Sequence, residues 1–196
     1  STQRTPPVDG ARYHGHAMTV AAQKKRSHIV DYLLFTWQME DLVRAAQFQP
    51  RLLEEWAENQ ANSEGTDPVE ESKWLLALAE DMRRSGAEEK GHAGSVKDAM
   101  AELAHLHELL LGTLNDARYR EAFNEAEPYL KDLGEKSPNE VHPVEQLALA
   151  LYGWLVLRMK KEAISAETEA AMRGLRNWAN ELARGHLGVY YPTSSP

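Results

Sequence analysis

Three charged residues, Glu40, Asp41 and Arg44, follow an apolar run in the stretch QKKRSHIVDYLLFTWQMEDLVR, residues 23–44. Carboxylates beside a guanidinium can bind a ligand or move a proton when they line a cleft. Glu40 and Arg44 are also four residues apart on a predicted helix, a spacing typical of a surface ion pair that contributes only about 0.3–0.5 kcal/mol. We expect structural pairing in preference to catalysis, because ion-pair networks shift side-chain pKa values without taking part in a reaction.

Arg158 is the cation that we expect to meet this group. Asp41 extends a helical stripe that includes Leu34 and Trp37, which predicts that its carboxylate enters the interior. A buried carboxylate needs a cation. Arg158 continues an apolar stripe on another predicted helix, so the phase of the two stripes predicts that Asp41 or Glu40 pairs with Arg158 at one end of the molecule.

The sequence His105-Leu106-His107 looks like a metal-binding pair. On a helix, however, residues two apart point about 200° away from each other, so the two rings cannot share one ion. His107 lies on an apolar stripe with Leu103 and Leu110, and we expect it to be buried and hydrogen-bonded, with His105 on the surface. A metal site at His107 would need ligands from elsewhere. We therefore expect no metal and no cofactor.

The segment AEEKGHAG, residues 87–94, is predicted to be a loop. Loops carry functional groups more often than helices do, and histidine titrates near neutral pH. Glu89 and His92 are therefore candidate ligand-binding residues, although a short solvated connector is the alternative. The candidate ligand-binding set, with no catalytic residue among it, is Glu40, Asp41, Arg44, Glu89, His92, His107 and Arg158.

Helical periodicity runs through most of the chain, and no run with the two-residue period of a strand has a useful length. Capping residues and prolines at first helical positions mark several helix starts. Ser95 is predicted to cap one helix, and Pro128 is predicted to kink or split another. The predicted helices span residues 19–47, 51–60, 68–86, 96–114, 117–133, 144–161 and 166–184.

These helices predict an all-α fold, an antiparallel bundle of six to seven helices around the apolar helix at about 144–161. That helix contains LALALYGWLVLRM, residues 147–159, and a helix that is apolar nearly all round is usually a central one. Residues 1–17 are predicted to be a disordered or extended arm, and Met18 is one possible start of the protein. Residues 18–188 form the predicted single domain, and 189–196 an extended tail.

Composition excludes several classes of protein. The chain has 22 Lys+Arg against 30 Asp+Glu, a formal net charge of -8, which disfavours binding to nucleic acid. It has no cysteine, so disulfides, zinc-thiolate sites and iron–sulfur clusters are excluded. No apolar run is long enough to span a membrane and no signal peptide is visible, so we expect a cytoplasmic protein.

Four blocks carry a resemblance to a known family: QKK…IVDYLLFTWQMEDLVR, then EKGH, LHELLL and VEQLALALYGWLVLRMKKEAISAET. Together they resemble a family of small bacterial cytoplasmic proteins known only as a domain of unknown function. The resemblance covers roughly residues 20–170. It implies an all-helical protein and supplies no catalytic residues.

The function that we expect is a helical protein-interaction or scaffold role. Five tryptophans, an acidic surface and the absence of phosphate-binding, nucleophile-elbow or zinc-protease motifs favour it. The partner would be another protein or a second copy in a homodimer. The alternative is a small-molecule-binding or enzymatic bundle with a polar site near Asp41 and Arg158.

Overall fold

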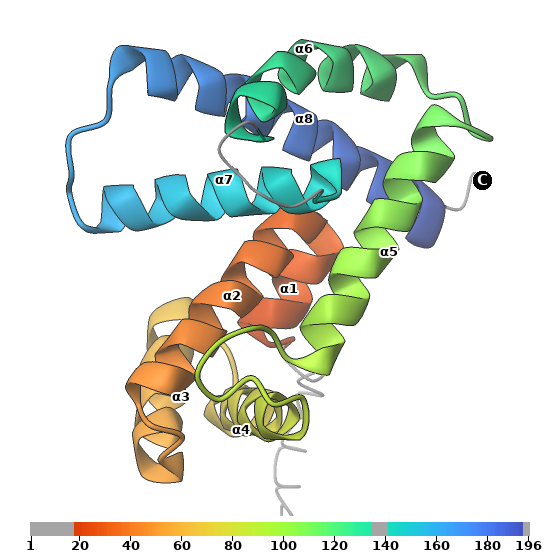
Figure 1. Ribbon diagram of the computed structural model, residues 1–196. Helices are drawn as coiled ribbons and strands as arrows, with labels where there is room; N and C mark the ends of the chain where they lie inside the picture. The colour runs from red at the N-terminus through yellow and green to blue at the C-terminus, as the bar shows by residue number, and fades with distance from the viewer. Residues whose placement is uncertain (1–17, 135–140, 194–196) are drawn as a thin grey trace, which may run out of the picture.

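The computed structural model describes residues 18–134 and 141–193, and within those ranges the chain is all-helical (Figure 1). The prediction of an all-α fold is confirmed, with eight helices in place of six to seven. The predicted arm, residues 1–17, and the end of the predicted tail lie outside the described residues. The helices are α1 Val20–Ser27, α2 Ile29–Ala45, α3 Pro50–Glu64, α4 Pro68–Arg84, α5 Gly94–Leu111, α6 Ala117–Gly134, α7 Pro143–Met159 and α8 Ala166–Tyr190.

The single helix predicted over 19–47 is two helices, so that prediction is wrong. His28 has an extended backbone, with φ -157° and ψ 102°, and its ring accepts a hydrogen bond from the Asp31 amide at 3.2 Å. The other ring nitrogen of His28 lies 3.0 Å from Oδ1 of Asn180 on α8. A side-chain acceptor at this position starts a new helix. The break lets α1 pack beside α2 (Figure 1).

The expected cap of α5 is wrong: the helix begins at Gly94, and Ala93 in place of Ser95 is its N-cap residue. Of the kink or split predicted at Pro128, the split does not occur, because α6 continues past this residue. The last helix also extends six residues beyond the predicted end at Arg184, to Tyr190, and so includes the first residues of the predicted tail.

The centre of the molecule is not α7, as the sequence predicted, but α2 and α8. α8 contacts five other helices, and its Leu175, Trp178 and Leu182 side chains are fully buried. α7 buries side chains only in its N-terminal part, up to Leu151. Figure 1 shows the C-terminal half of α7 and the first turns of α8 extending away from the other helices. Apolar composition made α7 look central, but too few neighbours cover its second half.

Close packing between α8 and α5 gives a first prediction. A Cβ atom on Gly185 would lie 2.6 Å from Cδ1 of Leu110, which is buried. We expect Gly185→Ala to lower the free energy of unfolding by about 1 kcal/mol, the low end for overpacking, because the leucine side chain can turn. Gly188→Ala is the control on the same helix, since nothing lies within 4 Å of its Cβ position. Urea denaturation compares them, and equal stability of the two variants would contradict the prediction.

None of the helices in the described ranges is both long enough and apolar enough to cross a lipid bilayer.

Candidate functional site

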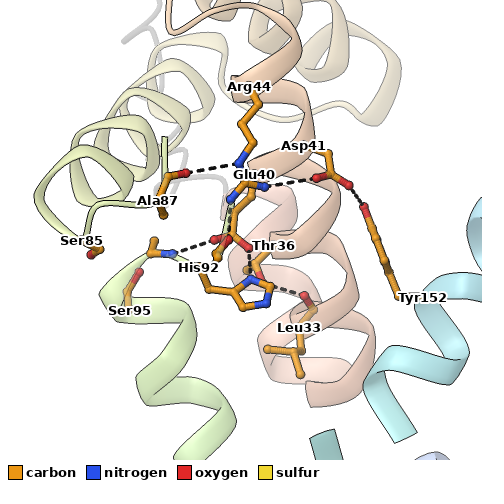
Figure 2. Close-up of polar contacts among 12 residues, drawn as sticks. Leu33, Thr36, Glu40, Asp41, Arg44, Ser85, Ala87, His92, Ser95 and Tyr152 are labelled. Atoms are coloured by element: carbon orange, nitrogen blue, oxygen red, sulfur yellow. Dashed lines mark hydrogen bonds and ion pairs between the residues drawn. The ribbon is translucent and has the colours of Figure 1, made fainter. Parts of the chain in front are cut away.

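Glu40 is the most buried charged side chain of the candidate set, with 1% of its surface exposed. One carboxylate oxygen lies 2.7 Å from Nδ1 of His92, and the other accepts the Ala93 amide at 2.7 Å (Figure 2). Both partners belong to the loop between α4 and α5. The carboxylate of α2 therefore holds this loop, and both of its oxygens are occupied.

The start of α5 receives two more side chains from α4. Ser85 Oγ accepts the Gly94 amide at 2.8 Å, and Asp81 accepts the Ser95 amide at 3.0 Å. With Ala93, three consecutive amides at a helix N-terminus bind side-chain oxygens from other elements, where the partial positive charge of the helix favours acceptors. Burial opposes ionisation of Asp81, but hydrogen bonds from Ser95 and the nearby Arg84 lower the pKa of this carboxyl on balance.

Arg44 attaches the same loop from the other side. Its Nε donates to the Ala87 carbonyl at 3.2 Å, and the guanidinium also donates to the Gly91 carbonyl. Nη1 also lies 3.2 Å from Oδ1 of Asp41. The guanidinium of Arg44 on α2 therefore contacts both the loop and a neighbouring side chain of its own helix. Figure 2 shows Arg44 reaching from α2 toward the loop, above Glu40.

Asp41 connects this group to α7. Its Oδ2 accepts a hydrogen bond from the Tyr152 hydroxyl (Figure 2), while 58% of the side chain remains exposed. Burial, the hydrogen bond to Asp41 and the negative charges of Asp41 and Glu40 raise the pKa of Tyr152, so the phenol stays protonated and donates. The sequence predicted that Asp41 enters the interior, and this is wrong: the buried carboxylate is the neighbouring Glu40.

An aromatic layer lies behind these polar groups. The His92 ring stacks on Trp37, with 4.7 Å between centroids and 21° between planes. Trp37 in turn contacts Tyr152 edge-on at 5.5 Å. Within the described ranges, the buried Nε1 of Trp37 finds no hydrogen-bond partner. The stacking fixes the orientation of the His92 ring in addition to its contact with Glu40.

The predicted pair of Asp41 or Glu40 with Arg158 does not form. The guanidinium of Arg158 lies 4.8 Å from the ring centre of Trp154, and the side chain is exposed. No ion pair of Arg158 occurs among residues 18–134 and 141–193. The phase of the stripe did place Arg158 beyond the apolar part of α7, but its guanidinium lies over Trp154, and the group that α7 presents to Asp41 is the Tyr152 hydroxyl.

Of the other candidates, Glu89 is exposed in the loop, and no hydrogen bond or ion pair holds it within the described part of the chain. His107 lies elsewhere, in the core between α5, α6 and α8. The structure thus brings together Glu40, Asp41, Arg44 and His92 and leaves out Glu89, His107 and Arg158. We call the four residues, with the loop that they hold, the α2 clasp.

His107 is buried and hydrogen-bonded, as predicted, and His105 is exposed. The Tyr119 hydroxyl accepts the Trp178 indole N–H at 2.9 Å and lies 2.5 Å from Nδ1 of His107. Because an indole nitrogen only donates, the tyrosine proton points to the histidine, which is neutral with its proton on Nε2. Burial lowers the pKa of His107 to about 4, despite the opposing charge of Glu108.

The polar groups of this arrangement are engaged by the protein itself. Across the described residues, no cluster of three or more His, Cys, Asp or Glu side chains could hold a metal ion. Both oxygens of Glu40 contact the loop, and Arg44 binds the loop carbonyls and Asp41. The α2 clasp is therefore built to position the α4–α5 loop and the start of α5.

Sequence reasoning missed four residues of this region: Trp37, Asp81, Ser85 and Tyr152. Tyr152 lies on the apolar helix predicted to be central, and its hydroxyl donates to Asp41. Asp81 and Ser85 share one helix face, four residues apart, next to a glycine-bounded loop. That spacing was the available signal, but it does not say which amides the side chains reach.

Comparison with known proteins identifies one family. The sequence profile of a domain of unknown function (DUF4924) matches residues 18–189. The chain belongs to the DUF4924 family. No significant match was found among curated proteins or among solved structures. The matched region includes every residue of the α2 clasp and nearly all of α8. The family description names no activity.

Proposed function

We propose that this DUF4924 protein is a helical interaction protein that pairs with a second copy of itself through α7. The observation that carries the proposal is the exposure of an uncharged helix. Residues 146–157, QLALALYGWLVL, contain no charged side chain. Nevertheless, Leu149 is 52% exposed and Met159, just beyond, is 62% exposed. Large apolar side chains exposed along an uncharged helix favour an interaction site.

A groove beside α7 supports the same proposal. It has a volume of about 400 Å³ and lies between α7 and the pair α2 and α3. Apolar side chains dominate its walls, among them Leu42, Trp56, Val156 and Met159. Met159, the most exposed apolar side chain of α7, also lines this groove, and in a two-fold interface each copy offers the same patch.

Charge at the rim of the groove is also self-complementary. Asp41 and Lys160 both line it, and they carry opposite charges. The Asp41 carboxylate also bonds Arg44 and Tyr152, but 58% of the side chain is exposed, so in a two-fold arrangement it can face Lys160 of the second copy, which favours correct pairing. Gln38 adds a neutral polar group between them. A partner with a uniformly charged surface would not be matched in this way.

The test is the molar mass of the full chain by size exclusion with light scattering. We expect a dimer at about micromolar concentration, and we expect Met159→Glu to raise the dimer dissociation constant at least about 100-fold, as burial of an unpaired charge in an apolar interface does. Val69→Glu, on α4, is the matched control, because Val69 is 60% exposed and lies away from α7.

A wild-type chain that remains monomeric at about 100 μM, far above the dissociation constants of specific complexes, contradicts the proposal. Equal loss of pairing in Met159→Glu and Val69→Glu contradicts it as well, because the interface would then not involve α7.

The alternative function, a ligand or enzyme site near Asp41 and Arg158, has no support from the geometry. The two residues do not pair, and the carboxylates of the α2 clasp are engaged by the protein itself. The cytoplasmic setting expected from the sequence stays a prediction, and cell fractionation with an antibody to the chain would check it.

A further inference from the structure

We infer that a second cavity, on the other side of α7, binds a small organic monocarboxylate with an apolar body. The cavity has a volume of about 200 Å³ and lies where α1, α2, α7 and α8 meet. This volume is below the roughly 300–1,000 Å³ of sites for drug-sized ligands, so the ligand is a smaller molecule. The inference does not depend on pairing of two copies.

The apolar side chains that line the cavity indicate the kind of body that the ligand has. Leu34 and Phe35 of α2 and Leu151 and Leu155 of α7 line the cavity. Trp154 also lines it, and its buried Nε1 is without a hydrogen-bond partner in the part of the chain that the structure describes. Aliphatic and aromatic walls favour a hydrocarbon or aromatic ring.

The charged side chains at the cavity indicate the head group of the ligand. Arg176 binds Asp31 through two hydrogen bonds of 2.6 and 2.9 Å, which use both oxygens of the carboxylate. The hydrogen bond to Arg176 and the charges of His28, Arg176 and Lys24 outweigh burial and lower the pKa of Asp31, so this carboxyl is ionised at neutral pH. One negative charge is therefore already matched by one guanidinium.

Lys24 supplies the surplus positive charge. Its ammonium lies 5.6 Å from the ring centre of Phe35, and among the described residues no carboxylate is within ion-pair distance of it. The cavity thus has two cations and one anion in a protein whose formal net charge is -8. The net positive charge at the cavity attracts anions.

A single surplus charge beside apolar walls selects a monocarboxylate over a phosphate. A phosphate dianion requires several donors converging on it, commonly backbone amides at a helix N-terminus or bidentate arginines. Here the arginine is occupied by Asp31, and the remaining polar side chain at the cavity is the amide of Gln38. A carboxylate on Lys24, with its hydrocarbon part against Phe35 and Leu155, fits both the charge and the walls.

The test is calorimetric titration of the full chain with 3-phenylpropionate and with hexanoate, and with 3-phenylpropionamide as the neutral counterpart. We expect saturable binding of the acids and at least tenfold weaker binding of the amide, the loss that goes with removing a charge-assisted hydrogen bond of about 1.5 kcal/mol or more. The two acids distinguish an aromatic from an aliphatic ligand. Absence of saturation by about 10 mM, above the usual millimolar limit for metabolite sites, overturns the inference.

Two lysine variants locate the binding. Lys24→Met is expected to weaken binding of the acids at least about tenfold. Lys25→Met, at the adjacent exposed lysine that does not line the cavity, is expected to leave binding unchanged. Circular dichroism confirms that both variants are folded. Equal affinity of the two variants for the acids, or equal affinity of wild type for acid and amide, overturns the assignment.

Discussion

Replacement of Glu40 by alanine is expected to lower the free energy of unfolding by about 3 kcal/mol. The side chain is almost completely buried and makes hydrogen bonds of 2.7 Å to His92 and to the Ala93 amide. Alanine leaves that amide without an acceptor and opens a cavity, and each effect costs on the order of 1–3 kcal/mol. The loop between α4 and α5 should loosen with it, because Glu40 joins the loop to α2.

Urea denaturation at pH 7 measures this effect, with Asp41→Ala as the matched control. Asp41 is the next residue on the helix, but it is mostly exposed, so its loss is expected to cost less than about 1 kcal/mol. Glu40→Gln, which keeps the shape and one acceptor oxygen, should fall between the two. If Glu40→Ala costs no more than Asp41→Ala, the α2 clasp is not a structural device.

Stability is expected to fall between pH 6.5 and pH 4 because His107 must stay neutral in the folded protein. Its folded pKa of about 4 is lower than the ordinary 6.5, so in this window the unfolded chain binds a proton that the folded chain does not. Lowering the pH therefore favours unfolding. Between pH 7 and pH 4.5 this one group should remove about 2 kcal/mol of stability.

The measurement compares the pH dependence of urea denaturation in His107→Gln and His105→Gln. His107→Gln should be less stable than wild type at pH 7, because it disturbs the hydrogen bonds of Tyr119 and Trp178, yet its stability should fall less on acidification. His105→Gln, at an exposed position on the same helix, should keep the wild-type pH dependence. Burial also lowers the pKa of His186, but that group is present in both variants and cancels.

A pH dependence of His107→Gln identical to that of wild type would show that His107 is not held neutral by its surroundings. The same result in His105→Gln is expected and carries no contradiction.

The sequence by itself determined most of the helices and the way in which several of them begin. Asp67, His142 and Ser165 accept hydrogen bonds from the amides of the helices that follow them, and Pro68 and Pro143 occupy first helical positions. Capping side chains and first-turn prolines act within a few residues, so they can be recognised from neighbouring residues in the sequence. The burial of His107 was equally predictable, because its phase on an apolar stripe is a local property.

Tertiary structure alone decided which carboxylate of the Glu40-Asp41 pair enters the interior. Both lie at the edge of the apolar face of α2, about 100° apart on the helix. The choice depends on where the α4–α5 loop brings the Ala93 amide, a contact between positions 53 residues apart. Helical periodicity carries no information about such a distance.

Contacts between distant positions also explain why two predictions are wrong, the central position of α7 and the pairing of Arg158 with a carboxylate of α2. Periodicity shows that residues 147–157 are apolar nearly all round, but the number of helices that cover them depends on how α2 and α8 pack. An apolar helix whose second half is only partly buried looks the same in sequence as a fully buried one. Composition determined what kind of surface α7 presents, and packing determined that the surface is exposed.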